Sequence, residues 1–225
     1  MSGPGSIYLF DIDGTLISAH GAGRRSFERA LEAELGITNG LVGIKLDGKT
    51  DPLILDEAMA AAGRGPATDD ERRRVFFRYL AGLDAELESA SYRVLPGVER
   101  TLDLLAGTGA HIGLQTGNLE EGARRKLQRG GLWDRFAFGG YGSDAHVREH
   151  LVAIAIERGR ARAGTKIDPR SIWVIGDTPR DIEAAHASGA RSVGVATGGY
   201  DADALRAAGA ELVVSTLEEW TLTRA

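Results

Sequence analysis

The chain has 225 residues, of which 43% are hydrophobic and 26% are charged, so it is a globular sequence long enough to bury a substantial core. Its net charge of -5 argues against nucleic acid, or an anionic membrane surface, as a partner held by bulk electrostatics. It contains no cysteine, which excludes disulfides, thiolate metal sites and cysteine nucleophiles.

The beginning of the sequence does not have the features of a targeting segment. Residues Met1 to Ser6 are small and polar, without the cationic stretch and the apolar run of a signal peptide. No later apolar run approaches the roughly 18 residues that a membrane span needs. We therefore expect a cytoplasmic protein with no membrane partner.

The first third of the chain is predicted to be one strand followed by helices. The apolar run Ile7 to Phe10 is typical of a buried strand and ends in the polar segment Asp11-Ile-Asp-Gly-Thr. Apolar residues at helical spacing then predict helices over residues 21–35, 53–62 and 69–87. No strand is expected from about residue 18 to residue 91, so this stretch reads as an inserted helical domain.

From Pro96-Gly97 onward the pattern changes to strands that alternate with helices. The predicted strands are 111–114, 136–138, 171–175, 192–196 and 212–214, and the predicted helices are 96–106, 119–128, 147–163 and 181–188. Such alternation indicates βαβ units and a mainly parallel sheet, so the predicted fold class is α/β.

Polar residues follow three of the predicted strands at the point where each strand ends. Asp11 and Asp13 follow the first strand, Thr116 a middle strand, and Asp177 and Asp181 a later strand. The carboxyl ends of parallel strands share one edge of a sheet, where ligands bind. We therefore expect these residues to converge in one crevice.

The acids of this crevice predict a magnesium site. Asp11 and Asp13 repel each other unless a cation lies between them, and Asp177 adds a third carboxylate. Oxygen ligands without histidine or cysteine favour Mg²⁺, which would bridge the protein to a phosphate oxygen. Asp181 would hold the metal or its water from the first turn of a helix.

The same residues can be given roles in phosphoryl transfer. Asp11 at the strand end is placed to attack phosphorus, and Asp13 to give a proton to the leaving oxygen and later take one from water. The Thr116 hydroxyl, with the backbone N–H groups of Gly117 and Asn118, would cradle the phosphate. Each residue alone could be a cap or turn residue, but three such motifs in this order are not expected by chance.

The motifs resemble those of the haloacid dehalogenase superfamily. The matching segments are Asp11-Ile-Asp-Gly-Thr-Leu16, Gln115-Thr116-Gly117-Asn118 and Gly176-Asp177-Thr178-Pro179-Arg180-Asp181, while residues 184–190 and 194–198 resemble its phosphoglycolate-phosphatase-like branch. The resemblance covers nearly the whole chain. It implies a Rossmann-like core of residues 1–17 and 92–225, with a helical-bundle cap domain of residues 18–91.

One departure from the family concerns a cation. The family has a lysine between its second and last motifs, but here no lysine lies between Lys126 and Lys166. Arg148 is the candidate replacement, because its fork of donors can hold a phosphate and the nucleophile together. The alternative is a solvated arginine on the face of a helix.

The predicted cap domain offers candidate substrate contacts. The segment Asp47-Gly48-Lys49-Thr50-Asp51 resembles the substrate-facing loop of capped relatives, so Lys49 and Thr50 are candidates, although a solvated lysine in a turn is the alternative. His20 and Arg24 lie just beyond the first linker and could reach the pocket. The hinges are expected near residues 16–18 and 92–96.

The leading hypothesis is a magnesium-dependent phosphatase that forms an aspartyl-phosphate on Asp11 and hydrolyses a small phosphomonoester, such as phosphoglycolate or a sugar phosphate. A phosphosugar mutase, or a phosphonatase with a Schiff base on Lys49, would use the same core. A non-catalytic binding module is the alternative from a different class. The expected partner is a small phosphorylated metabolite, and both a monomer and a homodimer are open.

Overall fold

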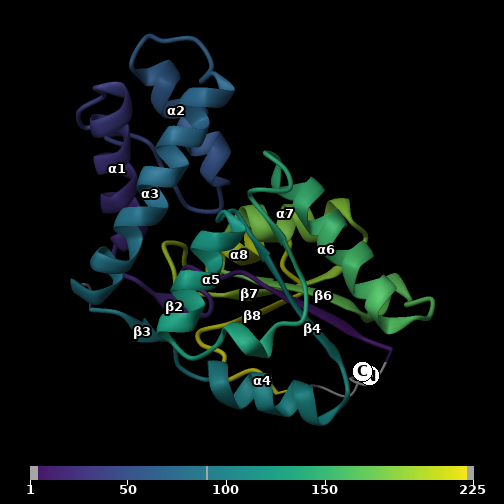
Figure 1. Ribbon diagram of the computed structural model, residues 1–225. Coiled ribbons are helices and arrows are strands. Elements are labelled where there is room, and N and C mark those ends of the chain that lie inside the picture. The colour runs from purple at the N-terminus through teal and green to yellow at the C-terminus, as the bar shows by residue number, and fades with distance from the viewer. Residues whose placement is uncertain (1–4, 90, 222–225) are drawn as a thin grey trace.

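A computed structural model of the chain describes residues 5–89 and 91–221. Its centre is a six-stranded sheet in the order β5-β4-β1-β6-β7-β8 (Figure 1). All neighbouring strands of this sheet are parallel. The strands are β1 (Ile7–Phe10), β4 (His111–Thr116), β5 (Gly139–Tyr141), β6 (Ile172–Gly176), β7 (Arg191–Val195) and β8 (Leu212–Val214). The α/β fold class is confirmed.

Helices and one small second sheet account for the other elements of the described residues. The helices are α1 (Ala22–Leu35), α2 (Asp51–Ala61), α3 (Asp69–Ser89), α4 (Val98–Gly107), α5 (Glu120–Arg129), α6 (Arg148–Ala163), α7 (Pro179–Ala187) and α8 (Ala202–Ala207), with 3-10 turns at Trp133–Arg135 and Pro169–Ser171. The second sheet pairs β2 (Ile17–Ser18) with β3 (Arg93–Val94) in antiparallel fashion. None of the helices in the described residues has both the length and the apolar composition of a membrane span.

Strand β1 lies at the middle of the sheet, and its side chains pack against helices on both faces of the sheet. Its register aligns Phe10 with Leu114 of β4 and with Ile175 of β6, so the ends of the three strands lie side by side. Successive strand residues face opposite sides. Ile7 and Leu9 pack with α6 and α7, whereas Tyr8 and Phe10 pack on the other side, where α4 and α5 also contribute.

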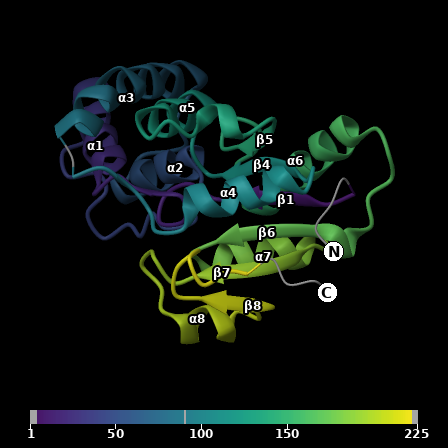
Figure 2. The same ribbon diagram turned by 90° about the horizontal axis from the view of Figure 1, so that it is seen from below.

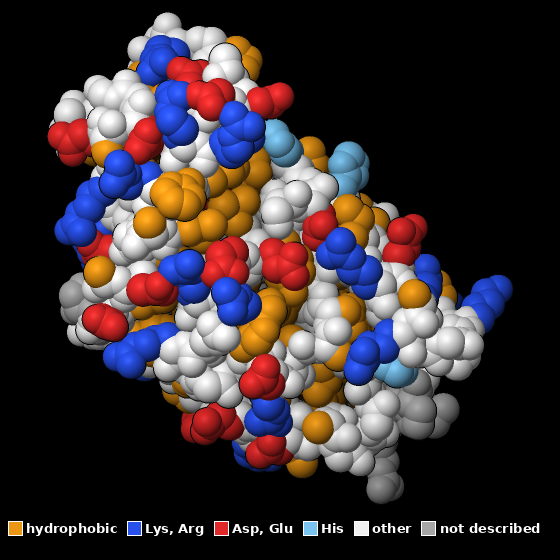
Figure 3. Space-filling model, in the orientation of Figure 1, with side chains coloured by type: hydrophobic (Ala, Val, Ile, Leu, Met, Phe, Trp, Pro, Cys, Tyr) orange, Lys and Arg blue, Asp and Glu red, His pale blue; other side chains and the backbone are white. Residues whose placement is uncertain are grey.

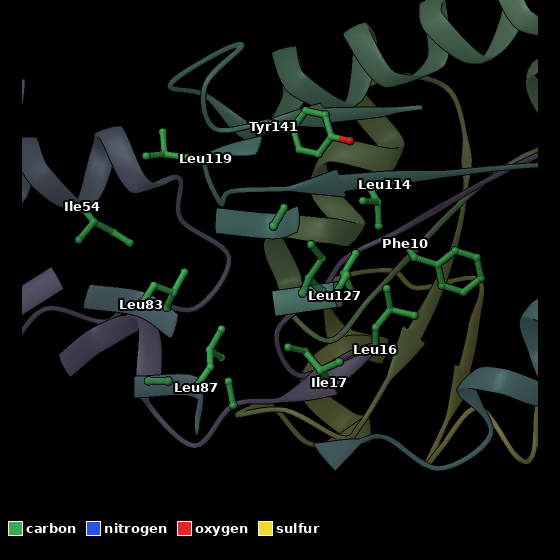
Figure 4. Close-up of a cluster of buried hydrophobic side chains, with 14 of the residues drawn as sticks. Phe10, Leu16, Ile17, Ile54, Leu83, Leu87, Leu114, Leu119, Leu127 and Tyr141 are labelled. Carbon is green, nitrogen blue, oxygen red and sulfur yellow. The ribbon is translucent and has the colours of Figure 1, made fainter. Parts of the chain in front are cut away.

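The helices α1, α2 and α3 lie together at one end of the molecule in both views (Figures 1 and 2). Helix α1 packs along α3, where Phe27 contacts the rings of Phe76 and Tyr79. The apolar cluster of this segment is continuous with that of the sheet: it runs from Phe10 through Ile17 to Leu83 (Figure 4).

Several element boundaries differ from the sequence predictions. The predicted strand 136–138 lies three residues further on, at β5. The ring of Phe138 packs over Gly113, and the residues that pair with β4 begin with Gly139 and Gly140. Gly140 has no room for a side chain, since an added Cβ would lie 2.0 Å from the Leu151 carbonyl oxygen. Helix α2 begins earlier than predicted, because the Thr50 hydroxyl accepts from Leu53 N at 3.3 Å.

Other elements were not predicted at all: β2, β3 and α8 are too short to give a periodic signal. The proposed division into residues 1–17 with 92–225 and residues 18–91 remains a prediction. Residues 1–4, 90 and 222–225 of those ranges lie outside the described residues.

Trp220 packs against two aromatic side chains of the sheet, so we expect it to stabilise the fold. Trp220 is 4% exposed, and its ring lies 6.0 Å from that of Tyr8 and 6.5 Å from that of Trp173. We expect Trp220→Ala to lower the free energy of unfolding by roughly 3–5 kcal/mol, measured by urea denaturation, since it removes a large buried side chain. Leu104→Ala, at a 42% exposed position on α4, is the control. Equal effects of the two substitutions would contradict this account of the core.

Candidate active site

Three buried carboxylates meet at the carboxyl edge of the sheet. Asp11 follows β1, Asp177 follows β6, and Asp181 lies in the first turn of α7. Each offers an oxygen within 4.8 Å of the others. The parallel register of β1 with β6 produces this meeting, and Asp11 N donates to the Ile175 carbonyl at 2.8 Å.

Arg148 is the cation in contact with this group. It is the first residue of α6 and is only 5% exposed. Its Nη2 lies 2.8 Å from Asp11 Oδ1 and 2.6 Å from Asp181 Oδ1, and its Nε donates to Gln115 Oε1 at 3.2 Å. The solvated helix-face alternative for Arg148 therefore does not hold.

The acids carry more negative charge than Arg148 can balance. Burial, reinforced by the charges of Asp181 and Asp13 and opposed by Arg148, raises the pKa of Asp11 to about 7. Burial and the charges of Asp11 and Asp181 raise the pKa of Asp177 well above its ordinary value. One guanidinium facing three buried carboxylates leaves a site that a divalent cation would neutralise, and an oxygen donor set suits a hard cation. The residues thus fit a divalent metal ion.

Asp181 differs from the other two acids, because both its oxygens accept from protein donors. Oδ1 accepts from Arg148 and from Gln115 Nε2 at 2.7 Å, and Oδ2 accepts from the backbone N–H and hydroxyl of Thr178 at 3.0 and 2.7 Å. The bond from the Thr178 backbone N–H is one half of the capping box that begins α7, and the other half is the bond from the Asp181 backbone N–H to the Thr178 side chain. Asp181 therefore both starts this helix and orients Arg148.

The side chain of Asp13 lies apart from the acid cluster. It is 44% exposed, and its Oδ2 accepts from Asn118 Nδ2 at 2.8 Å and from Lys126 Nζ at 2.6 Å. Lys126 Nζ also donates to Asn118 Oδ1 at 2.7 Å. Asn118 Nδ2 in turn donates to Thr116 Oγ1 at 2.8 Å, so the second motif holds the acid of the first.

Lys126 was not among the predicted site residues. It is 4% exposed, although lysine is almost never fully buried unless it is paired. The sequence carried a signal that could have found it. The inward face of α5 is made of Gly122, Ala123, Lys126 and Leu127, a helical stripe in which the lysine is out of pattern.

The predicted phosphate-binding loop is tightly enclosed. Thr116 is fully buried, and its hydroxyl accepts from Asn118 N at 3.3 Å. A Cβ on Gly117 would lie 2.0 Å from the Lys49 carbonyl oxygen, so this position needs glycine. Here a loop that precedes α2 lies directly against the end of β4.

A cavity of about 320 Å³ lies between the sheet edge and helices α1–α3. In the space-filling view, hydrophobic side chains gather at this junction (Figure 3). The predicted site residues that line the cavity are Asp11, Asp13, His20, Arg24, Lys49, Thr116, Gly117, Asn118, Arg148 and Asp177. The remaining two, Thr50 and Asp181, are buried but are not among its lining residues.

Three of the four predicted substrate contacts from the helical segment already have partners within the protein. Lys49 Nζ forms an ion pair with Glu57 at 2.5 Å, and Arg24 bonds to Glu28 at 3.2 Å. The Thr50 hydroxyl donates to the His146 carbonyl at 2.7 Å. His20 lines the cavity with a left-handed backbone at a φ of 43°.

Asp51 is a second cavity residue that was not predicted as part of the site. It is 7% exposed, and its Oδ2 accepts from Leu119 N at 2.8 Å, which ties α2 to the start of α5. Burial raises the pKa of Asp51 to about 6, against the opposing effects of Lys126 and of the Leu119 N–H.

Comparison with known proteins gives consistent results. A family model described as haloacid dehalogenase-like hydrolase matches residues 8–186. The chain is 28% identical over 218 residues to "Probable phosphatase IndB" of Dickeya dadantii (strain 3937), covering 95% of this chain and 90% of that one. It is 29% identical over 198 residues to "Phosphoglycolate phosphatase" of Yersinia pseudotuberculosis serotype I (strain IP32953), covering 85% and 81%.

Among solved structures, a hydrolase from Pseudomonas syringae matches with a TM-score of 0.75 at 23% identity, and 94% of each chain is covered. At this level of identity the match supports the fold alone.

The buried carboxyl of Asp51 predicts a pH-dependent stability. Its pKa is raised from 3.8 to about 6, so the folded protein binds this proton more tightly than the unfolded chain does. The stability it contributes is complete below pH 3.8 and is lost as the pH rises through about 6. Between pH 4 and pH 7.5, we expect the wild type to lose roughly 2–3 kcal/mol relative to Asp51→Asn, whose amide stays neutral. Urea denaturation of both proteins at each pH measures this difference, and a constant difference would contradict the shift.

Proposed function

The chain belongs to the haloacid dehalogenase-like hydrolases, and on that basis we propose that it is a magnesium-dependent phosphatase of a small phosphomonoester. The curated relatives named above are described as phosphatases. The observation that carries the proposal is the pair of carboxylates at the end of β1. Asp11 lies buried against Arg148, while Asp13 stands apart and half-exposed in the same cavity.

In the proposed first step, an Asp11 carboxylate oxygen attacks the phosphorus of the ester. A new P–O bond forms to Asp11, and the bond from phosphorus to the leaving oxygen breaks. Asp13 gives its proton to that oxygen, so the alcohol leaves neutral. The contact of Arg148 with Asp11 Oδ1 at 2.8 Å fixes the orientation of the nucleophile.

In the second step, water attacks the phosphorus of the aspartyl-phosphate and Asp13 takes the proton from that water. The bond between phosphorus and the Asp11 oxygen breaks, which restores the carboxylate and releases inorganic phosphate. The same side chain acts first as acid and then as base.

Asp11 and Asp177 are the proposed magnesium ligands within the acid cluster, with Asp13 and Asp181 as the other two candidates from the motifs. When bound, Mg²⁺ would neutralise negative charge on the phosphate during transfer. The Thr15 hydroxyl donates to Asp177 Oδ1 at 3.0 Å and holds this carboxylate at the site. Thr116, Gly117, Asn118 and Arg148 are the proposed phosphate-binding residues.

We propose residues 18–91 as a cap domain that closes over the remaining core. The two connections run side by side as β2 and β3, at the positions expected for hinges. On the cap side, Lys49, His20 and Arg24 line the cavity and Thr50 fixes the loop before α2. The cavity of about 320 Å³ suits a small metabolite such as phosphoglycolate or a sugar phosphate.

Phosphate release from a panel of phosphate esters tests this proposal. We expect release to require both Mg²⁺ and Asp11, and Asp11→Asn to lower kcat by at least about a thousandfold, because it removes the nucleophile. Asp134→Asn, at an exposed acid, serves as the matched control and should keep full activity. If no ester releases phosphate but a sugar phosphate is isomerised, the chain is a mutase instead.

Thermal unfolding tests the metal site without an activity readout. Mg²⁺ at about 100 times its Kd stabilises a folded protein by about 2.7 kcal/mol, which corresponds to roughly 5–10 °C in Tm for a chain of this size. We expect this rise for the metal-free wild type on addition of Mg²⁺, and little or none for Asp177→Asn. The same rise in both proteins would remove Asp177 from the metal site.

A further inference from the structure

A buried lysine connects the acid–base residue to the helical segment that covers the site. Lys126 extends from the inward face of α5, and its ammonium group is almost completely removed from solvent. An ammonium in such a place is costly unless hydrogen-bond acceptors surround it. Its two acceptors are Asp13 Oδ2 at 2.6 Å and Asn118 Oδ1 at 2.7 Å.

The covering segment also approaches this ammonium group. A Cβ built on Gly23 of α1 would lie 3.3 Å from Lys126 Nζ and 3.7 Å from the Tyr79 hydroxyl of α3. The charge of Lys126 also acts on Asp51, the first residue of α2. Lys126 therefore lies next to α1 and lines the same cavity as Asp51 of α2 and Tyr79 of α3.

Two roles for this lysine can be separated by distance. If it served to neutralise Asp51, a direct contact between the two side chains would be expected. Instead, the Asp51 carboxylate accepts from Leu119 N, and Lys126 makes its direct contact with Asp13. The geometry thus points to Asp13 as the residue on which Lys126 acts.

We propose that Lys126 is a positioning residue that fixes the Asp13 carboxylate for proton transfer, an inference that rests on the proposed function. Lys126 and Asn118 both donate to the same oxygen of Asp13, Oδ2. Oδ1 is then the oxygen that gives its proton to the leaving oxygen as the P–O bond breaks. It takes a proton back from the attacking water in the second step.

The dependence of the rate on the leaving group tests this inference. A p-nitrophenolate leaves without a proton, so hydrolysis of p-nitrophenyl phosphate needs little help from a general acid, whereas an alkoxide needs the proton. The two substrates are therefore p-nitrophenyl phosphate and the alkyl phosphate that the wild type hydrolyses fastest. Both are measured at saturating Mg²⁺ in the full chain.

We expect Lys126→Met to lower kcat for the alkyl phosphate about a hundredfold and kcat for p-nitrophenyl phosphate less than about fivefold, with KM nearly unchanged. Lys126→Arg, which keeps the charge and the donors, should restore part of the lost rate. Lys166→Met, the same substitution at an exposed lysine, is the control. An equal loss on both esters, or no loss, would overturn the proposal.

The double variant with Asp13→Asn adds a second criterion. If Lys126 acts through Asp13, Lys126→Met should cause little further loss once Asp13 is replaced, whereas independent roles would give multiplied losses. Asp13→Asn alone must show the same selectivity for the alkyl ester. If Asp13→Asn slows both esters equally, the acid–base role itself is wrong; if only Lys126→Met lacks selectivity, the positioning role is wrong.

Gly23→Ala provides a variant that is not expected to unfold the chain, because alanine favours a helix. Its methyl group would press on Lys126 Nζ from the side of α1. We expect kcat for the alkyl phosphate to fall severalfold while kcat for p-nitrophenyl phosphate stays the same. Should circular dichroism show that Lys126→Met is unfolded, an unchanged ratio in Gly23→Ala would overturn the proposal.

Discussion

The burial of three carboxylates at one edge of the sheet is the constraint from which the rest of the site follows. Asp177 occupies the space where Gly14 and Gly198 would carry side chains: an added Cβ would lie 2.4 and 1.7 Å from its Oδ2. Gly176 leaves equivalent room for Asp181, because a Cβ added to Gly176 would lie 2.0 Å from the Asp181 Cγ. Arg148 supplies the opposing charge from the next layer. The glycines of the first and last motifs are thus a steric requirement of the acids.

Much of this arrangement could be predicted from the sequence, because it depends on strand ends. Asp11 and Asp177 follow short apolar runs, and parallel strands bring such ends together whatever their distance along the chain. Arg148 could also be predicted from the sequence, as a cation near the start of a predicted helix that follows a strand. Its contact with Asp11 is now described, while the catalytic role of each residue remains proposed.

The parts that were not predicted depend on side-chain packing between elements. Nothing local distinguishes Lys126 from a surface lysine except its place in an apolar stripe, and its partner Asp13 lies 113 positions away. The sequence places Asp51 in a loop, but in the structure its carboxylate accepts from Leu119 N and so connects α2 to the start of α5. The position of β5 has the same origin, because the need for glycine at residue 140 comes from its close contact with the Leu151 carbonyl of α6.

The pairing of β2 with β3 has a mechanical consequence. Both crossings between the helical segment and the rest of the chain are bonded to each other, through the pair Ile17 and Val94 and through Leu95 N donating to the Leu16 carbonyl at 2.9 Å. A two-strand ribbon of this kind bends as one strip, so neither crossing can turn without the other. A change in the backbone direction at one crossing would therefore be transmitted to the other through the bond between Leu16 and Leu95.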